Sequence, residues 1–106
     1  MNIKITDQSD IIEHYGVRNQ LGIAMEECSE LIQAISKMNR TDGNSEEYMK
    51  SKLHLEEEIA DVIVCINQLK SIYNISDSRI SELANYKINR QRGRIRDESE
   101  HIGNRL

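Results

Sequence analysis

Two long stretches of this chain repeat apolar residues at every third or fourth position, and no proline interrupts them because the chain contains none. The first stretch runs from about residue 17 to 39, and the second from about 44 to 73. This spacing is that of an α-helix and not of a β-strand. The absence of proline also favours long helices over a sheet. The pattern therefore predicts an all-α fold.

Start and stop signals place a short helix before the first long one. Asp7 or Ser9 can cap this short helix, and Gly16 is expected to stop it. Asn44 followed by Glu47 resembles a capping box for the second long helix, with Asn in place of the usual Ser or Thr. Turn-forming residues between the two long stretches predict a loop there.

A last helix is expected to start after Ser76, which is a good N-cap, and to carry apolar residues as far as Ile95. The polar sequence after Arg96 predicts a frayed tail over 97–106, and residues 1–8 are expected to form a flexible arm. Short connections make consecutive helices antiparallel neighbours. The chain is thus expected to be one domain, residues 1–106, folded as an antiparallel helical bundle.

The expected core is small and aliphatic, because 38% of the 106 residues are hydrophobic but none is Phe or Trp. Its predicted members on the two long helices are Leu21, Met25, Cys28, Ile32, Ile35, Leu55, Ile59, Val62, Ile66 and Leu69. Cys28 and Cys65 lie in these stretches, which predicts a reduced, buried thiol pair in a cytosolic protein. A thin core also favours further burial through oligomerisation.

Charge and hydropathy argue against several classes of function. The formal net charge of −4 argues against general nucleic-acid binding. No apolar run is long enough to span a bilayer, and the first residues lack the apolar segment of a signal peptide. We therefore expect a soluble cytoplasmic protein with neither a nucleic-acid nor a membrane partner.

Acidic side chains occur inside both apolar stretches, where a helix facing a core normally carries methyl groups. On a wheel of about 100° per residue, Glu27 falls about 20° from Ala34, and Glu58 is again inside the apolar arc. Glu30 and Asp61 follow three residues after them, so each helix directs two acids inward. The other acids of the two clusters point outward or lie on the polar side: Glu26, Glu56 and Glu57. Four converging carboxylates need a cation, and a set of oxygen ligands without a suitably placed His or Cys fits Mg²⁺ or Mn²⁺.

Cations lean toward the apolar side of the last helix. They are Lys87 and Arg90, with Arg94 between them on the wheel. Their aliphatic stems can cover the core while the charges reach water. Beside an acidic metal site, the same cations can instead bind phosphate oxygens. Carboxylates holding Mg²⁺ opposite such cations suit a polyphosphate ligand.

These elements resemble the MazG-like, all-α nucleoside triphosphate pyrophosphohydrolases, which share a superfamily with dimeric dUTPases and dCTP pyrophosphatases. The family motif E-E-x-x-E followed by E-x-x-D is matched by Glu26-Glu27-Cys28-Ser29-Glu30 and Glu58-Ile59-Ala60-Asp61. The third element, a Lys with a nearby Asn and Arg, is matched by Lys87-Ile88-Asn89-Arg90. Residues 15–21 are similar to the lead-in of the first motif helix in dCTP pyrophosphatases. The resemblance covers roughly residues 11–95.

The resemblance implies hydrolysis of a nucleoside triphosphate between its α and β phosphates, by a homodimer or homotetramer. Implied Mg²⁺ ligands are Glu27, Glu30, Glu58 and Asp61, with Glu26 assisting or positioning water. The resemblance also implies that Lys87 and Arg90 stabilise phosphate oxygens, with Asn89 nearby, although the wheel turns Asn89 away from Lys87. Further candidates for substrate binding are Arg94, from its place on the wheel, and Asn19 and Gln20, which are expected near the mouth of the pocket.

Two other classes of protein share parts of this pattern. A non-catalytic helical oligomerisation or regulatory module would also have acid-rich amphipathic helices and a small core. Di-iron carboxylate bundles use paired Glu-x-x-His motifs. The one such sequence here, Glu98-Ser99-Glu100-His101, lies in the expected tail, which sets the di-iron class aside.

Overall fold

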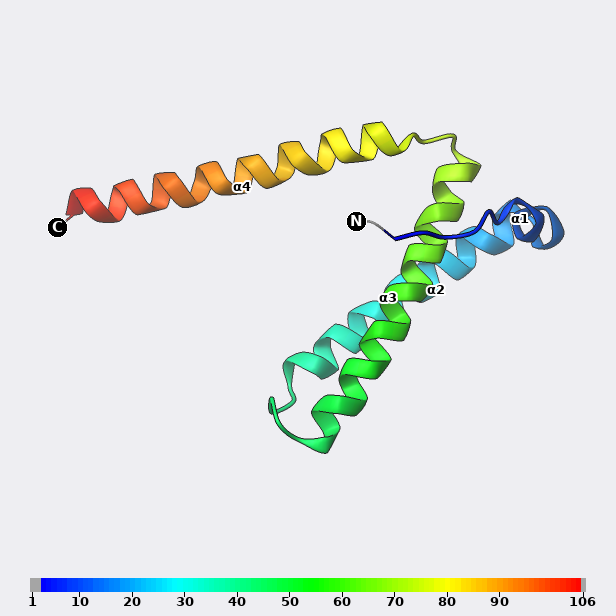
Figure 1. The fold of residues 1–106 in the computed structure, drawn as a ribbon, viewed down its shortest axis with the longest axis horizontal. Coiled ribbons are helices and arrows are strands. Elements are labelled where there is room, and N and C mark those ends of the chain that lie inside the picture. The colour runs from blue at the N-terminus through cyan, green and yellow to red at the C-terminus, as the bar shows by residue number, and fades with distance from the viewer. Residues whose placement is uncertain (1–2, 106) are drawn as a thin grey trace. The chain divides into compact units, whose positions relative to one another are not determined.

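The computed structural model describes residues 3–105, which form four helices and no strand (Figure 1). The helices are α1 (Ser9–Tyr15), α2 (Val17–Asn39), α3 (Glu46–Ile72) and α4 (Asp77–Arg105). The predicted all-α class is confirmed. The chain contains two compact units, and the single domain over residues 1–106 stays a prediction. The first unit ends at Asn74 and contains α1, α2 and α3, and the second contains α4.

The first unit begins with the short helix α1, whose end is set by a glycine. Gly16 has a φ of 86°, which residues with a side chain rarely adopt, and it separates α1 from α2 as predicted. The start of α1 differs from the prediction, because the N-cap is Gln8 and makes no side-chain capping bond. Ser9 lies inside the helix, and its hydroxyl donates to the Asp7 carboxylate instead of capping.

The N-cap of α3 lies one residue after the predicted cap. The Ser45 hydroxyl oxygen accepts a hydrogen bond from the backbone N–H of Tyr48 at 3.0 Å, so Ser45 and not Asn44 is the N-cap. Serine and asparagine are about equally good caps, and the sequence offers both side by side. The remaining ends of α2 and α3 agree with the prediction to within one residue.

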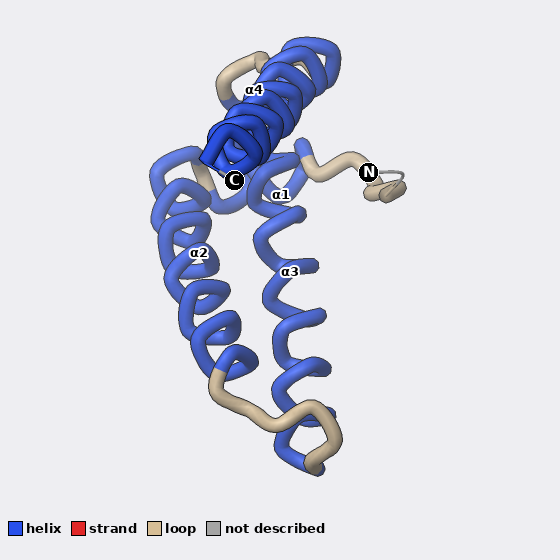
Figure 2. The backbone as a smooth tube through the Cα atoms, turned by 90° about the vertical axis from the view of Figure 1, so that its left-hand side faces the viewer, coloured by secondary structure: helices blue, strands red, loops and turns tan. Residues whose placement is uncertain are grey.

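Helices α2 and α3 lie side by side and antiparallel, joined by a loop (Figures 1 and 2). Their buried residues are mostly small or polar: Gln20, Ala24 and Ala34 on α2, and Ser51, Glu58, Val62, Cys65 and Gln68 on α3. These residues recur mainly at intervals of three and four, so each helix has one buried stripe. The small side chains let the two helices pack closely, and the polar ones require partners within the interface.

A chain of buried carboxamides ties the segment before α1 to this helix pair. Gln20 Nε2 donates to Gln68 Oε1 at 2.8 Å, and Gln68 Nε2 donates to Gln8 Oε1 at 2.9 Å. All three glutamines are about 95% buried, since each keeps 5% of its surface accessible. Of the predicted arm, residues 1 and 2 lie outside the described residues, whereas Gln8 is held in place by this bond.

Most of the predicted core stripe of α2 is exposed, so that prediction is wrong. Met25, Ile32 and Ile35 keep 71%, 68% and 51% of their surface accessible, and Cys28 is exposed as well. Two packed helices bury only the stripe along which they touch. The apolar arc of α2 is wider than this stripe and includes a second face, about 100° further round the helix.

The core stripe predicted for α3 is partly confirmed. Val62 is buried, but Ile59 and Ile66 keep 43% and 45% of their surface accessible. An apolar groove of about 540 Å³ is lined mainly by residues of α2. The side chains lining this groove include Leu21, Met25, Cys28 and Ile32 of α2 and Leu69 of α3. The first unit therefore has an apolar face that its own helices leave uncovered.

The second unit is one long helix. Ser76 caps α4 as predicted, because its hydroxyl oxygen accepts a hydrogen bond from the Arg79 backbone N–H at 3.2 Å. The helix continues well past Arg96, where the sequence predicts fraying; residue 106 of the predicted tail lies outside the described residues. Opposite charges four residues apart, such as Arg94 and Glu98, favour helix in that region.

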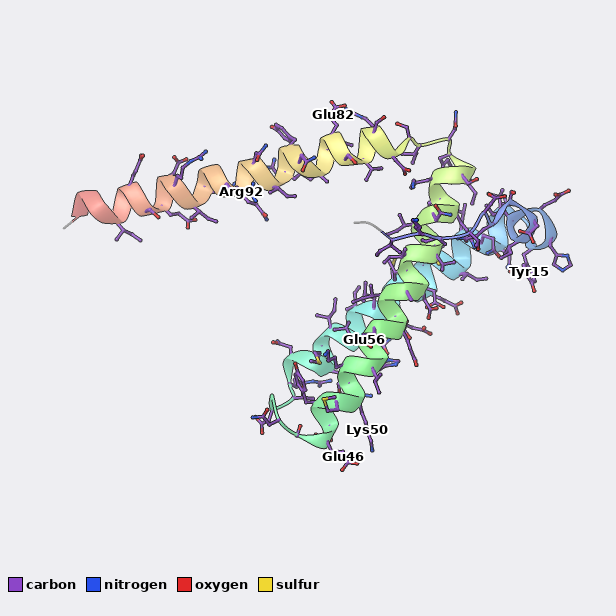
Figure 3. All side chains as sticks on the ribbon, viewed as in Figure 1. Tyr15, Glu46, Lys50, Glu56, Glu82 and Arg92 are labelled. Carbon is purple, nitrogen blue, oxygen red and sulfur yellow. The ribbon has the colours of Figure 1, made fainter. Side chains whose placement is uncertain are left out.

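The predicted core residues of α4 are exposed along its length. Ile80, Leu83, Ile88 and Ile95 keep between 38% and 60% of their surface accessible. Charged side chains such as Glu82 and Arg92 also project from it (Figure 3). None of the helices within residues 3–105 combines the length and the apolar character needed to cross a membrane.

Candidate metal centre

Three carboxylates from α2 and α3 meet within the first unit. Glu27 comes from the middle of α2, and Glu58 and Asp61 are three residues apart on one side of α3. One carboxylate oxygen from each lies within 4.8 Å of the other two. We call these three residues the carboxylate centre. Three of the four predicted metal ligands are thus brought together.

Two oxygens of the carboxylate centre are buried without a partner among the described residues. They are Oε2 of Glu27 and Oε2 of Glu58. The Glu58 side chain keeps only 8% of its surface accessible. A buried carboxylate oxygen that accepts no hydrogen bond is costly, so such a group binds a proton or a cation. The centre is therefore suited to bind positive charge.

The proton affinity of Glu27 reflects this crowding. Burial raises the pKa of Glu27, and the negative charges of Asp61, Glu30 and Glu58 raise it further. A protonated Glu27 can also donate to the Glu58 carboxylate, and together these effects bring the pKa of Glu27 from 4.5 to about 7. In the absence of a cation, Glu27 therefore holds a proton close to neutral pH.

The remaining predicted acids lie outside the centre. Glu30 is exposed and supplies none of the three converging oxygens, although its charge acts on Glu27. Glu26 is exposed on α2, next to Glu27 in the sequence. Glu56 and Glu57 are exposed, as predicted for ordinary surface acids (Figure 3 labels Glu56).

A histidine that the sequence analysis did not single out lies beside the centre. His54 Nε2 is 3.9 Å from Glu58 Oε1, and the two residues are four apart on α3. This spacing places two side chains on one helix face, so the signal was present in the sequence. His54 is not one of the three converging ligands, so the donor set consists of oxygens only, as predicted.

The two cysteines lie near the centre but differ in exposure. Both are free thiols; Cys65 is buried as predicted, whereas Cys28 is exposed. Burial raises the pKa of the Cys65 thiol, and the charges of Glu27, Cys28 and Asp61 add to this effect. A buried thiol with a raised pKa stays protonated and is unreactive, so Cys65 acts as a packing residue.

The predicted substrate-binding amides of α2 are held by other amides. Asn19 Nδ2 donates to Gln20 Oε1 at 3.0 Å, and Gln20 in turn donates to Gln68. Gln20 is buried, whereas Asn19 is exposed. Gln20 and Glu27 are seven residues apart, so they lie on the same side of α2, two turns from each other.

The predicted phosphate-binding cations belong to the second unit. Lys87, Arg90 and Arg94 are exposed on α4, and so is Asn89. The Arg90 guanidinium carbon lies 6.0 Å from the ring centroid of Tyr86. The carboxylates belong to the first unit, and a joint role of the two groups stays a prediction.

The likeness to MazG-like enzymes rests on three short sequence elements: the two acidic motifs and the basic motif of the last helix. Two of these elements supply the carboxylate centre. No protein-family model, curated protein sequence or solved structure matches this chain.

Proposed function

We propose that this protein is a Mg²⁺-dependent nucleotide pyrophosphohydrolase that cleaves a (deoxy)nucleoside triphosphate into a monophosphate and pyrophosphate. The observation that carries this proposal is the carboxylate centre, with its two buried oxygens that lack partners. The residues of the carboxylate centre belong to two acidic motifs, E-E-x-x-E followed by E-x-x-D, and this order also supports nucleotide pyrophosphohydrolysis.

The donor set suits a hard divalent cation. Glu27, Glu58 and Asp61 offer oxygens only, which Mg²⁺ and Mn²⁺ prefer over the nitrogen and sulfur ligands favoured by zinc. Two or three negative charges within one small cluster would offset the charge of such an ion. Glu30 is near enough to raise the pKa of Glu27 and would complete the set as a more distant ligand.

The chain's own residues have distinct roles in this proposal. When bound, the ion would supply charge neutralisation at the phosphates and lower the pKa of a water. Glu26, exposed next to the centre in sequence, would accept a proton from the attacking water. Cations would stabilise the phosphate oxygens, and amides would contact the nucleoside. The cations assigned to the phosphate oxygens are Lys87, Arg90 and Arg94. The amides assigned to the nucleoside are Asn19, Gln20 and Asn89.

The direct test is pyrophosphate release from a panel of NTPs and dNTPs with Mg²⁺. We expect release from at least one nucleotide, loss of release with EDTA, and a drop of at least about 100-fold for Glu58→Gln, as is typical when a charged transition-state contact is lost. Glu56→Gln is the matched control, because Glu56 is an exposed acid two residues away. Release that survives Glu58→Gln, or no release from any nucleotide, contradicts the proposal.

The exposed apolar residues favour a second candidate, a non-catalytic helical oligomerisation or regulatory module. Met25 and Ile32 are the clearest examples, at 71% and 68% exposure. This candidate predicts that Mg²⁺ leaves the melting temperature unchanged, and that Glu58→Gln is neutral or stabilising because it removes a buried charge. A Mg²⁺-dependent rise in melting temperature, lost in Glu58→Gln, would favour the enzyme instead.

A further inference from the structure

A second hollow lies in the first unit, next to the carboxylate centre. It has a volume of about 370 Å³, and its lining includes Lys37 and Arg40 from the end of α2 and His54 from α3. This volume is within the range of about 300–1,000 Å³ that is usual for small-molecule sites. We call it the basic hollow.

His54 connects the basic hollow to the carboxylate centre. Its ring lines the hollow, while its Nε2 is 3.9 Å from Glu58 Oε1. Glu58 is buried, and its second oxygen, Oε2, has no partner among the described residues. A ligand in the hollow would therefore lie one side chain away from the centre.

The lining of the basic hollow is suited to an anion. It contains two permanent cations and no carboxylate among the residues that line it. Gln33 and Ser36 add an amide and a hydroxyl that can donate hydrogen bonds. Lys37 and Arg40 are exposed, and neither forms an ion pair with another described residue.

The end of α2 would repel an anion if its last carbonyl groups were free, because a helix C-terminus carries partial negative charge. Two of these carbonyls accept hydrogen bonds. The Lys37 carbonyl accepts the Arg40 backbone N–H at 3.2 Å. The Met38 carbonyl accepts both the backbone N–H of Thr41 at 3.3 Å and its hydroxyl at 2.9 Å. The cationic side chains of Lys37 and Arg40 add positive charge at this end of the helix.

We propose that the basic hollow binds the phosphate chain that becomes pyrophosphate, with Lys37 and Arg40 as its ligands. This inference rests on the proposed function, because it places the leaving group of that reaction beside the carboxylate centre. Arginine matches phosphate with a planar set of N–H donors, and lysine adds a compact charge. In this proposal the first unit would hold the metal ligands together with cations for the leaving pyrophosphate.

Isothermal titration of the full chain with inorganic pyrophosphate, in Mg²⁺ and at constant ionic strength, tests this inference. The double variant Lys37→Ala/Arg40→Ala should bind about tenfold more weakly or worse, because it loses charge-assisted hydrogen bonds. Arg40→Lys should fall between this variant and the wild type, since it keeps the charge but loses the planar donors. Circular dichroism checks that the variants keep their helix content.

A matched control variant belongs to the same titration. Lys52→Ala removes an exposed cation that lies about 160° round α3 from His54, and its affinity should stay within about twofold of the wild type. The inference is overturned by wild-type affinity in Lys37→Ala/Arg40→Ala, by an equal loss in Lys52→Ala, or by absence of pyrophosphate binding at millimolar concentration.

These outcomes separate the inference from the proposed function. Pyrophosphate binding that depends on Lys37 and Arg40, without release from any nucleotide, would leave a polyphosphate site and remove the enzymatic proposal. If nucleotide cleavage depended on Glu58 but pyrophosphate affinity did not change in the Lys37 and Arg40 variants, the enzymatic proposal would stand and the pyrophosphate site would be removed.

Discussion

Glu27 couples folding to proton uptake, because its pKa is raised from 4.5 to about 7 in the folded protein. Below pH 4.5 the side chain is protonated in both states, and its contribution to stability is fully present. Between pH 4.5 and 7 the unfolded chain releases the proton first, so this contribution is lost as the pH rises. We expect the metal-free protein to lose stability from pH 5 to 7.5, by up to about 1 kcal/mol per pH unit from this group.

Thermal unfolding in EDTA across this pH range is the measurement, with Glu27→Gln beside the wild type. Glutamine stays neutral at every pH, so the variant should show a flatter dependence. Mg²⁺ should also flatten the wild-type curve, because a bound cation favours the ionised carboxylate. Equal slopes for the wild type and Glu27→Gln would show that Glu27 does not hold the proton.

At the scale of the helices, the pairing of α2 with α3 depends on the amide chain. Gln68→Leu leaves Gln20 Nε2 and Gln8 Oε1 without their present partners, which should cost about 1–3 kcal/mol of unfolding free energy. The double variant Gln20→Leu/Gln68→Leu should cost less than the sum of the single changes, since one buried bond is counted in both. Urea unfolding of the wild type, the two single variants and the double variant gives the four free energies of this double-mutant cycle. If the losses of unfolding free energy were additive, Gln20 and Gln68 would not be directly coupled.

Helix positions were readily predicted, but their inward faces were not. The spacing of apolar residues identified both long helices because it continues without proline through all their turns. It could not distinguish the stripe with Ala24 and Ala34, which meets α3, from the wider one with Met25 and Ile32. Small and polar residues give little hydropathy signal, so a stripe built from Ala and Gln is easily overlooked.

The carboxylate centre was predicted more fully than the core. Glu27, Glu58 and Asp61 converge because their spacing fixes which side of each helix they occupy, and that spacing is readable. His54 was missed although it obeys the same four-residue rule. The basic hollow was not predicted, because its shape depends on how α2 and α3 pack, and periodicity does not give this.

At the scale of the whole molecule, the apolar groove predicts self-association, which we infer to give a homodimer or homotetramer. Met25→Glu and Ile32→Glu introduce charges on this face and should shift the protein toward monomer at micromolar concentration. Met49→Glu is the control, because Met49 is 57% exposed and lies outside the groove. Sedimentation velocity measures the shift, and a wild type that is monomeric at every concentration would contradict the prediction.

The hydrogen bonds from Gln20 to Gln68 and from Gln68 to Gln8 also allow local opening of the first unit to be measured by hydrogen exchange of the side-chain amides. Exposed carboxamide protons exchange quickly with solvent deuterium, but those of Gln20 and Gln68 are buried and exchange only after local opening. In a nuclear magnetic resonance spectrum, their NH₂ signals should outlast that of the exposed Gln91 after transfer to heavy water. The lifetime of the Gln20 signal then reports how often α2 and α3 separate, and that of the Gln68 signal how often the segment before α1 leaves the helix pair.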